Sequence, residues 1–195
     1  MSFKEILKKI WHFIWNDNSA ASWIVNIILA FIIVKFLIYP GLGLLFGTGY
    51  PVVAVVSSSM EHNSGFESWW ENNKVWYTEN NITKDKFLGF PQKNGFNKGD
   101  IMVLIGRKPL NIKVGDVAVF KGSLKDPIIH RVVRIFMEDG NYYIQTKGDN
   151  NGASRNDELK IPVDSILGKA VLRIPWLGYV KISFVKVLDY IRGLV

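Results

Sequence analysis

The chain has 195 residues, a formal net charge of +7 and a pI near 9.5. This length accommodates one modest domain together with a membrane anchor. The absence of cysteine excludes disulfides, thiol catalysis and thiolate metal sites. Because the basic residues form no dense run, attraction to anionic lipid headgroups explains the charge better than binding to nucleic acid does.

Residues 1–19 have the pattern of an amphipathic helix. Lysines and a glutamate separate apolar residues that recur at helical spacing, namely Phe3, Ile6, Leu7, Ile10 and Ile14. We expect this segment to lie along the cytoplasmic face of a membrane. A soluble helix docked on the folded domain would have the same pattern.

Residues 20–46 are expected to form a transmembrane anchor and its junction. The segment Ala20–Tyr39 is apolar except for Asn26 and Lys35, and twenty helical residues span roughly 30 Å, the thickness of the hydrocarbon layer. Pro40-Gly41 then punctuates the helix, but Leu42–Tyr50 stays apolar and rich in glycine, so the span could run further or re-enter the membrane surface. The stretch is too long and starts too far from Met1 for a cleaved signal peptide, so we expect a retained anchor.

The distribution of lysine and arginine predicts the orientation of this anchor. Lys4, Lys8 and Lys9 precede it, and residues 40–59 contain neither lysine nor arginine. Positive charge collects on the cytoplasmic side of membrane helices. The sequence therefore predicts a single-pass protein of the cell membrane, with a cytoplasmic N-terminus and an extracytoplasmic domain over residues 47–178.

The domain opens with a run of β-branched residues that ends in serines. Residues 51–56 predict a buried strand, and Ser57, Ser58 and Ser59 follow at its rim. A hydroxyl held by a rigid element can act as a nucleophile when a base lies beside it. The alternative is an ordinary polar strand end.

Residues 61–97 predict a helical, tryptophan-rich insertion. Ser64 and Glu67 have the spacing of a capping box, and much of one helical face that follows is aromatic: Phe66, Trp69, Trp70, Trp76 and Tyr77. One interpretation is a small subdomain that packs its tryptophans into a local core. The other is a lid or a membrane-resting paddle, since tryptophan favours the lipid interface.

From residue 98 onward, short strands alternate with glycine turns and predict a mainly β, barrel-like fold. The expected strands are Ile101–Ile105, Val117–Phe120, Ile128–Phe136, Tyr142–Thr146 and Ile166–Ile174. Gly99-Asp100 and Gly115-Asp116 read as backbone turns without a chemical role. Residues 179–195 predict an amphipathic C-terminal tail, either interfacial or docked on the domain.

Four segments in this order, behind a membrane anchor, resemble the type I signal peptidases of the archaeal and endoplasmic-reticulum branch. They are residues 51–60, 98–101, 129–132 and 146–151, and the resemblance covers roughly residues 50–178. It implies a signal-peptidase-like β fold and a membrane-bound serine endopeptidase that removes signal peptides from translocated preproteins after small residues. The chain departs from the family pattern at His62, where a proline is usual, and in the long insertion that follows.

The resemblance also assigns the site. It implies that Ser59 is the nucleophile and that His130 is the general base. Asp157 is the implied third member of the triad and Asp149 a supporting residue, although both also suit turn capping. The Ser59 N–H and the Ser57 hydroxyl are the expected oxyanion donors. The pockets that would select small side chains have four candidate lining residues: Val53, Val55, Ile128 and Val132.

The implied chemistry requires no metal and no cofactor. The expected partners are preproteins with signal peptides and membrane lipid, with the translocation channel as a further candidate and no nucleic acid. Two other functions agree with the same sequence. One is a related serine peptidase that processes other membrane-proximal substrates. The other is a non-catalytic membrane adaptor for secretory clients, which would have no chemical reason to keep Ser59, His130 and both aspartates.

Overall fold

A computed structural model describes residues 2–106, 112–123 and 126–193. The chain divides into two compact units, Met1–Leu45 and Phe46–Val195, which are described separately. The last two residues of the expected C-terminal tail lie outside the described range. Residues 124 and 125, in the loop before the expected strand Ile128–Phe136, also lie outside it.

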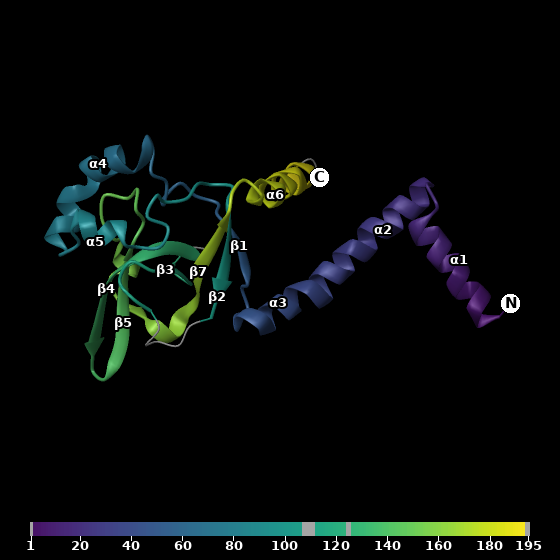
Figure 1. The fold of residues 1–195 in the computed structure, drawn as a ribbon, viewed down its shortest axis with the longest axis horizontal. Helices are drawn as coiled ribbons and strands as arrows, with labels where there is room; N and C mark the ends of the chain where they lie inside the picture. Colours follow the sequence, from purple (N-terminus) through teal and green to yellow (C-terminus); the bar gives the residue numbers. More distant parts are fainter. Residues whose placement is uncertain (1, 107–111, 124–125, 194–195) are drawn as a thin grey trace. The chain divides into compact units, whose positions relative to one another are not determined.

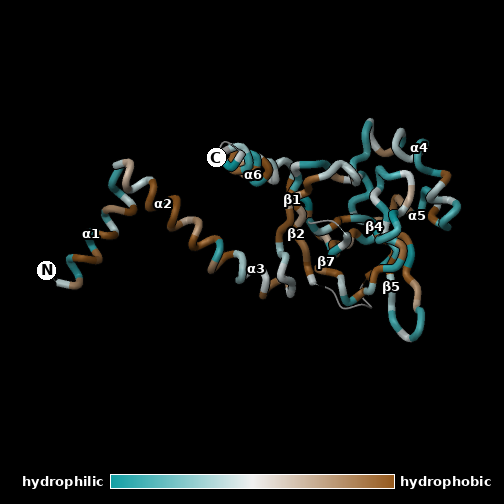
Figure 2. Tube along the Cα trace, turned by 180° about the vertical axis from the view of Figure 1, so that it is seen from behind, coloured by the Kyte–Doolittle hydropathy of each residue, from teal (hydrophilic) through white to brown (hydrophobic). Residues whose placement is uncertain are grey.

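The N-terminal unit is helical (Figure 1). Helix α1 spans Phe3–Trp15, and a continuous helix then runs through α2 (Ala20–Ile33), the π-helical turn η1 (Val34–Ile38) and α3 (Tyr39–Phe46). Among the described residues, Ala20–Phe46 is the one helix long and apolar enough to cross a membrane (Figure 2). The polar exception Asn26 donates a hydrogen bond of 2.9 Å to the carbonyl of Ile14, and this bond ties α2 to α1.

The helix continues through Pro40-Gly41 to Phe46, which is the longer span that the sequence left open. The π-helical turn Val34–Ile38 ends two residues before Pro40. A wider turn of this kind accommodates a residue that cannot donate the usual backbone hydrogen bond. The apolar helix is therefore 27 residues long, about 40 Å at 1.5 Å per residue.

The second unit is built on a curled antiparallel sheet (Figure 1), which confirms the predicted mainly β fold. Its spatial order is β1-β2-β7-β3-β4-β5-β6. The strands are β1 (Val52–Ala54), β2 (Ile101–Ile105), β3 (Val117–Phe120), β4 (Ile128–Glu138), β5 (Asn141–Lys147), β6 (Ile161–Pro162) and β7 (Ile166–Ile174). Short 3-10 turns, η3 (Asn156–Glu158) and η4 (Val163–Ser165), flank β6.

Strand β3 lies inside the sheet and is buried on both faces. Val117 and Val119 pack into one apolar core with Met60, while Ala118 and Phe120 pack into a second core. Its sequence is wholly apolar for this reason, since neither face meets water. Met60 directly follows the expected nucleophile Ser59, so its burial in the first core holds this part of the chain in place.

The Gly-Asp turns shape the backbone as predicted. Gly99 and Gly115 have φ angles of +90° and +96°, which favour glycine. The following aspartates accept hydrogen bonds from backbone N–H groups three residues earlier, at 2.7 Å for Asp100 and 2.9 Å for Asp116. These bonds fix the backbone of the turns from which β2 and β3 begin.

The insertion forms helices α4 (Gly65–Glu79) and α5 (Lys84–Leu88) and packs an aromatic core. Its buried members are Trp69, Trp70, Tyr77, Ile82 and Phe87, together with Val133 of β4. The predicted capping box at Ser64 is wrong. Ser64 has a left-handed φ of 62° instead of the extended backbone of a capping residue, and its side chain caps nothing. The chain ends in helix α6 (Gly178–Gly193), which projects from the end of β7 (Figure 1).

Candidate active site

Ser59 lies in a tight turn between β1 and the insertion. The strand itself ends at Ala54, earlier than the apolar run predicted, and Val55 continues the pairing through a hydrogen bond of 2.9 Å from its N–H to the Asp100 carbonyl. Met60 is buried and Ser59 partly exposed. The turn therefore presents the hydroxyl of Ser59 while its neighbour anchors it in the core.

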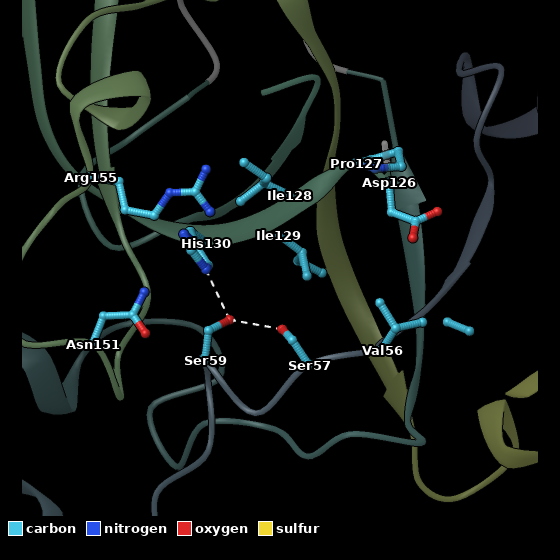
Figure 3. A pocket seen from close by; sticks show the side chains of 11 residues that line it. Val56, Ser57, Ser59, Asp126, Pro127, Ile128, Ile129, His130, Asn151 and Arg155 are labelled. Carbon is cyan, nitrogen blue, oxygen red and sulfur yellow. Dashed lines mark hydrogen bonds between the residues drawn. The ribbon is translucent and has the colours of Figure 1, made fainter. Parts of the chain in front are cut away.

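His130 meets this hydroxyl from strand β4. Its Nε2 atom lies 2.9 Å from Ser59 Oγ (Figure 3). His130 begins a run of four buried residues in β4, His130–Val133, and only 4% of it is exposed. The sequence-predicted nucleophile and base, Ser59 and His130, thus lie within hydrogen-bond reach although 71 positions separate them.

The carboxylate that contacts His130 belongs to Glu158, and this differs from the sequence expectation of Asp157. Glu158 Oε1 accepts from His130 Nδ1 and, at 3.0 Å, from the Thr146 hydroxyl. Its Oε2 accepts the N–H of Arg155 at 3.0 Å. Burial raises the pKa of the Glu158 carboxyl, but these hydrogen bonds outweigh burial and hold the pKa below its usual range. Glu158 is therefore ionised at neutral pH and acts only as an acceptor.

This ionised carboxylate fixes the tautomer of His130. Nδ1 must carry the proton that it donates to Glu158, which leaves Nε2 free to accept the proton of the Ser59 hydroxyl. A hydroxyl, an imidazole and a carboxylate therefore form one hydrogen-bonded line, which is the arrangement that an activated serine nucleophile requires.

Asp157 points elsewhere. It accepts hydrogen bonds from the Ser123 hydroxyl at 2.6 Å and from Arg155 Nη2 at 2.7 Å. The Ser123 bonds lower the pKa of Asp157 to about 2, and Arg155 contributes in the same direction. The turn η3 is the physical reason for the difference, because successive residues of a 3-10 turn face different directions and Glu158 is the one that faces the core.

Asp149 contacts Arg131, the residue that follows His130, rather than His130 itself. Arg131 donates to its carboxylate from Nε at 2.9 Å and from Nη2 at 2.7 Å, and both side chains are fully buried. His62 Nε2 lies 2.9 Å from the same carboxylate, and the Tyr77 hydroxyl donates to it at 3.0 Å. Burial raises the pKa of Asp149, but Arg131 and His62 outweigh burial and hold the pKa well below its usual range.

The loop of Asp149 holds the nucleophile turn. The N–H of Asn150 donates to the Ser59 carbonyl at 2.8 Å, and Asn150 Nδ2 donates to the Ser58 carbonyl at 3.2 Å. Trp69 of the insertion donates to the Asp149 carbonyl at 3.0 Å and stacks on His62. The insertion is thereby joined to the loop that supports Ser59, a connection that sequence reasoning missed.

The expected oxyanion donors lie beside the nucleophile. Ser57 Oγ is 3.1 Å from Ser59 Oγ. Within the part of the chain that the structure describes, the Ser59 N–H donates no hydrogen bond. Both groups can therefore serve an oxygen that develops charge next to Ser59.

A groove of about 540 Å³ runs past Ser59 and His130. Asn151 and Arg155 lie at one end, and Val56, Asp126 and Pro127 lie at the other (Figure 3). Of the four expected pocket residues only Ile128 lines it. Val55 and Val132 are buried in the cores, and Ala54 and Val56 line the groove in place of Val53 and Val55. The pairing of β1 with β2 sets which face meets the groove, and an unbroken apolar run carries no sign of it.

Across the described residues, no group of three or more histidine, aspartate or glutamate side chains is arranged to hold a metal ion. The arrangement at Ser59 supports acyl transfer by a serine nucleophile with histidine as base.

Comparison with known proteins agrees with a peptidase. No family model matches the chain. It is 32% identical over 157 residues to the signal peptidase complex catalytic subunit SEC11 of Lachancea thermotolerans, which covers 75% of this chain and 73% of that protein. The namesake proteins of Fusarium vanettenii and Sclerotinia sclerotiorum are 30% and 29% identical over 86% and 87% of this chain, and 82% and 84% of their own lengths.

Proposed function

Because the chain belongs to the signal peptidase complex catalytic subunits, the endoplasmic-reticulum branch of the type I signal peptidases, we propose that Ser59, His130 and Glu158 are its catalytic triad. The protein is a membrane-bound serine endopeptidase that removes signal peptides. One observation carries the triad: Ser59 Oγ, both ring nitrogens of His130 and the Glu158 carboxylate form a continuous hydrogen-bonded line.

The reaction begins when His130 Nε2 takes the proton of the Ser59 hydroxyl as Oγ attacks the scissile carbonyl. Glu158 keeps Nδ1 protonated and stabilises the imidazolium that forms. The Ser59 N–H and the Ser57 hydroxyl donate to the oxyanion. The tetrahedral intermediate collapses as Nε2 gives its proton to the leaving amine, which is the new N-terminus of the mature protein. A water molecule then gives a proton to His130 Nε2 as its oxygen attacks the acyl carbon. Nε2 passes the proton to Ser59 Oγ when the bond between Oγ and the signal peptide breaks.

Asp149 is a supporting residue in this account. It holds Arg131 and the loop that binds the Ser59 carbonyl through Asn150. Asp157 acts on the groove instead of the triad, since it fixes Ser123 and Arg155 near the groove wall.

The groove explains a preference for small side chains before the cut. Ala54, Ile128 and Ile129 line it next to the nucleophile. Branched walls at this distance exclude bulk more than they attract any one residue. Preproteins that carry a small residue at the cleavage position are the substrates on this view.

The apolar helix Ala20–Phe46 is the anchor, and the lysines before it favour a cytoplasmic N-terminus. Residues 1–19 then lie at the cytoplasmic surface, and residues 47–178 form the extracytoplasmic peptidase domain, in the cell membrane. A preprotein that emerges from the translocation channel would meet Ser59 close to the bilayer.

The test is cleavage of a preprotein by the full chain in detergent micelles, with wild type and Ser59→Ala compared. We expect one cut after a small residue, identified by the mass of both products, and a rate lower by roughly 10⁴-fold or more in the variant. Equal cleavage by both proteins would overturn the assignment of Ser59. Cleavage at large residues would overturn the proposed substrate class.

A further inference from the structure

Helix α6 is fixed to the domain at its first residue. The N–H of Gly178 donates to the Gly99 carbonyl at 2.8 Å, and Trp176 N–H donates to Asp100 Oδ1 at 3.2 Å. A side chain at Gly178 would meet the Asp100 carbonyl at 2.7 Å, so the helix starts in direct contact with this turn. Its origin and direction are therefore set by the folded domain.

One side of α6 faces the domain. A hollow of about 220 Å³ lies between them, lined by Lys181, Ile182, Val185 and Lys186 of α6 and by Val56, Lys98 and Asp126 of the domain. Val56 and Asp126 also line the groove. The hollow under α6 thus continues the groove at the end away from Arg155.

The opposite side of α6 is apolar, and no described part of the chain covers it. Val180, Phe184 and Val187 occur at positions i, i+4 and i+7, which places them on one stripe of the helix. Their exposed fractions are 70%, 62% and 55%. A bare stripe of this length costs free energy in water, and it indicates a surface that meets another phase or another molecule.

The surroundings of the stripe favour lipid over protein. Trp176 precedes it and Tyr190 follows it, and both side chains are at least 70% exposed. The helix carries three basic residues, Lys181, Lys186 and Arg192, against one acidic residue, Asp189. Aromatic rings and basic side chains beside an apolar stripe are typical of helices at the headgroup boundary, whereas lysine is depleted from protein interfaces.

The chain also keeps α6 within reach of a bilayer. Five residues separate Phe46, the end of the apolar helix, from Val52 at the start of β1. An extended segment of that length covers at most about 20 Å. Val55, just beyond β1, pairs with the Gly99-Asp100 turn that holds Gly178, so the start of α6 is tied to the strand that follows this short connection.

We propose that α6 is an interfacial helix that inserts the stripe Val180, Phe184 and Val187 into the boundary between lipid headgroups and acyl chains. Lys181 and Lys186, which line the hollow beneath the helix, then meet anionic headgroups where that hollow opens. The hollow beneath the helix opens at the bilayer surface, which would place that end of the groove where a membrane-bound substrate arrives. The lipid contact itself does not depend on the catalytic assignment.

The chain's lack of cysteine makes a direct test simple. The full chain is prepared with a single substitution, Phe184→Cys, labelled with an environment-sensitive fluorophore and reconstituted into nanodiscs that contain anionic phospholipid. A matched variant, Asp189→Cys, carries the label on the polar side of the same helix. Met137→Cys, on the exposed end of β4, serves as a label far from α6 in sequence.

We expect the label at residue 184 to show a blue-shifted emission and strong loss of fluorescence with a quencher attached to the lipid acyl chain. The labels at residues 189 and 137 should respond to an aqueous quencher instead. Equal lipid quenching at residues 184 and 189, or none at 184, would overturn the proposal. Shielding of residue 184 from both quenchers would also overturn it, because a protein partner would then cover the stripe. Preprotein cleavage by the same labelled samples reports separately on the catalytic site.

Discussion

Glu158 accepts a hydrogen bond from His130 Nδ1 although its neighbour Asp157 is the shorter and more familiar carboxylate for this role. Glu158 is fully buried, and its second oxygen is held by the N–H of Arg155. A carboxylate fixed from both sides can hold the imidazole in one tautomer without moving during the reaction. This contact is the basis for placing Glu158 in the proposed triad with Ser59 and His130.

The Ser57 hydroxyl is expected to matter for the rate and little for folding. Ser57→Ala removes a donor 3.1 Å from Ser59 Oγ, so kcat should fall by about 10²-fold while KM changes little. Ser58→Ala is the matched control, because Ser58 is an exposed neighbour whose carbonyl, not its side chain, contacts Asn150. Steady-state cleavage of a preprotein measures both. An equal loss in the two variants would remove Ser57 from the oxyanion site.

The Asp149–Arg131 pair should be the more costly of two aspartate–arginine pairs to break. Asp149→Asn leaves the fully buried Arg131 without its counter-charge, and we expect the free energy of unfolding to fall by about 3–5 kcal/mol. Asp157→Asn breaks a partly exposed pair with Arg155 and should cost about 1 kcal/mol or less. Chemical denaturation in detergent compares them. Similar small losses would contradict a structural role for Asp149.

The sequence predicted the strands well and the site less completely. The bounds of β2, β3 and β7 match the expected ranges, because short apolar runs between glycine turns are local signals. The choice between Asp157 and Glu158 depends on the three-residue turn η3, which periodicity does not encode. The glutamate directly after Asp157 was the available signal. The contact of His62 with Asp149 spans 87 positions and required the folded chain.

Lys147 gives a pH dependence with a definite sign. Burial lowers its pKa from 10.5 to about 8, although Asp149 acts in the opposite direction. Below pH 8 the folded and unfolded chains both carry the proton, so the burial penalty is fully present. Between pH 8 and 10.5 only the unfolded chain binds it, and the free energy of unfolding therefore rises with pH.

Lys147→Met should lack this rise. Between pH 7.5 and 9.5, the free energy of unfolding should rise by about 2 kcal/mol more in the wild type than in Lys147→Met, because only the wild type has the Lys147 amine. Denaturation curves at both pH values measure the difference, in which the other titrating groups largely cancel. Parallel pH profiles in the two proteins would show that Lys147 is not buried as a charged group.

The most direct test of the triad compares Glu158→Gln with Asp157→Asn in single-turnover cleavage of one preprotein. Both variants replace a carboxylate by an amide at adjacent positions, and only Glu158 contacts His130. We predict that Glu158→Gln lowers the rate of the chemical step by roughly 10³–10⁴-fold, because the imidazole loses its tautomer. Asp157→Asn should stay within about threefold of wild type, since it removes only a partly exposed ion pair. A large loss in Asp157→Asn with near-normal cleavage by Glu158→Gln would contradict the account.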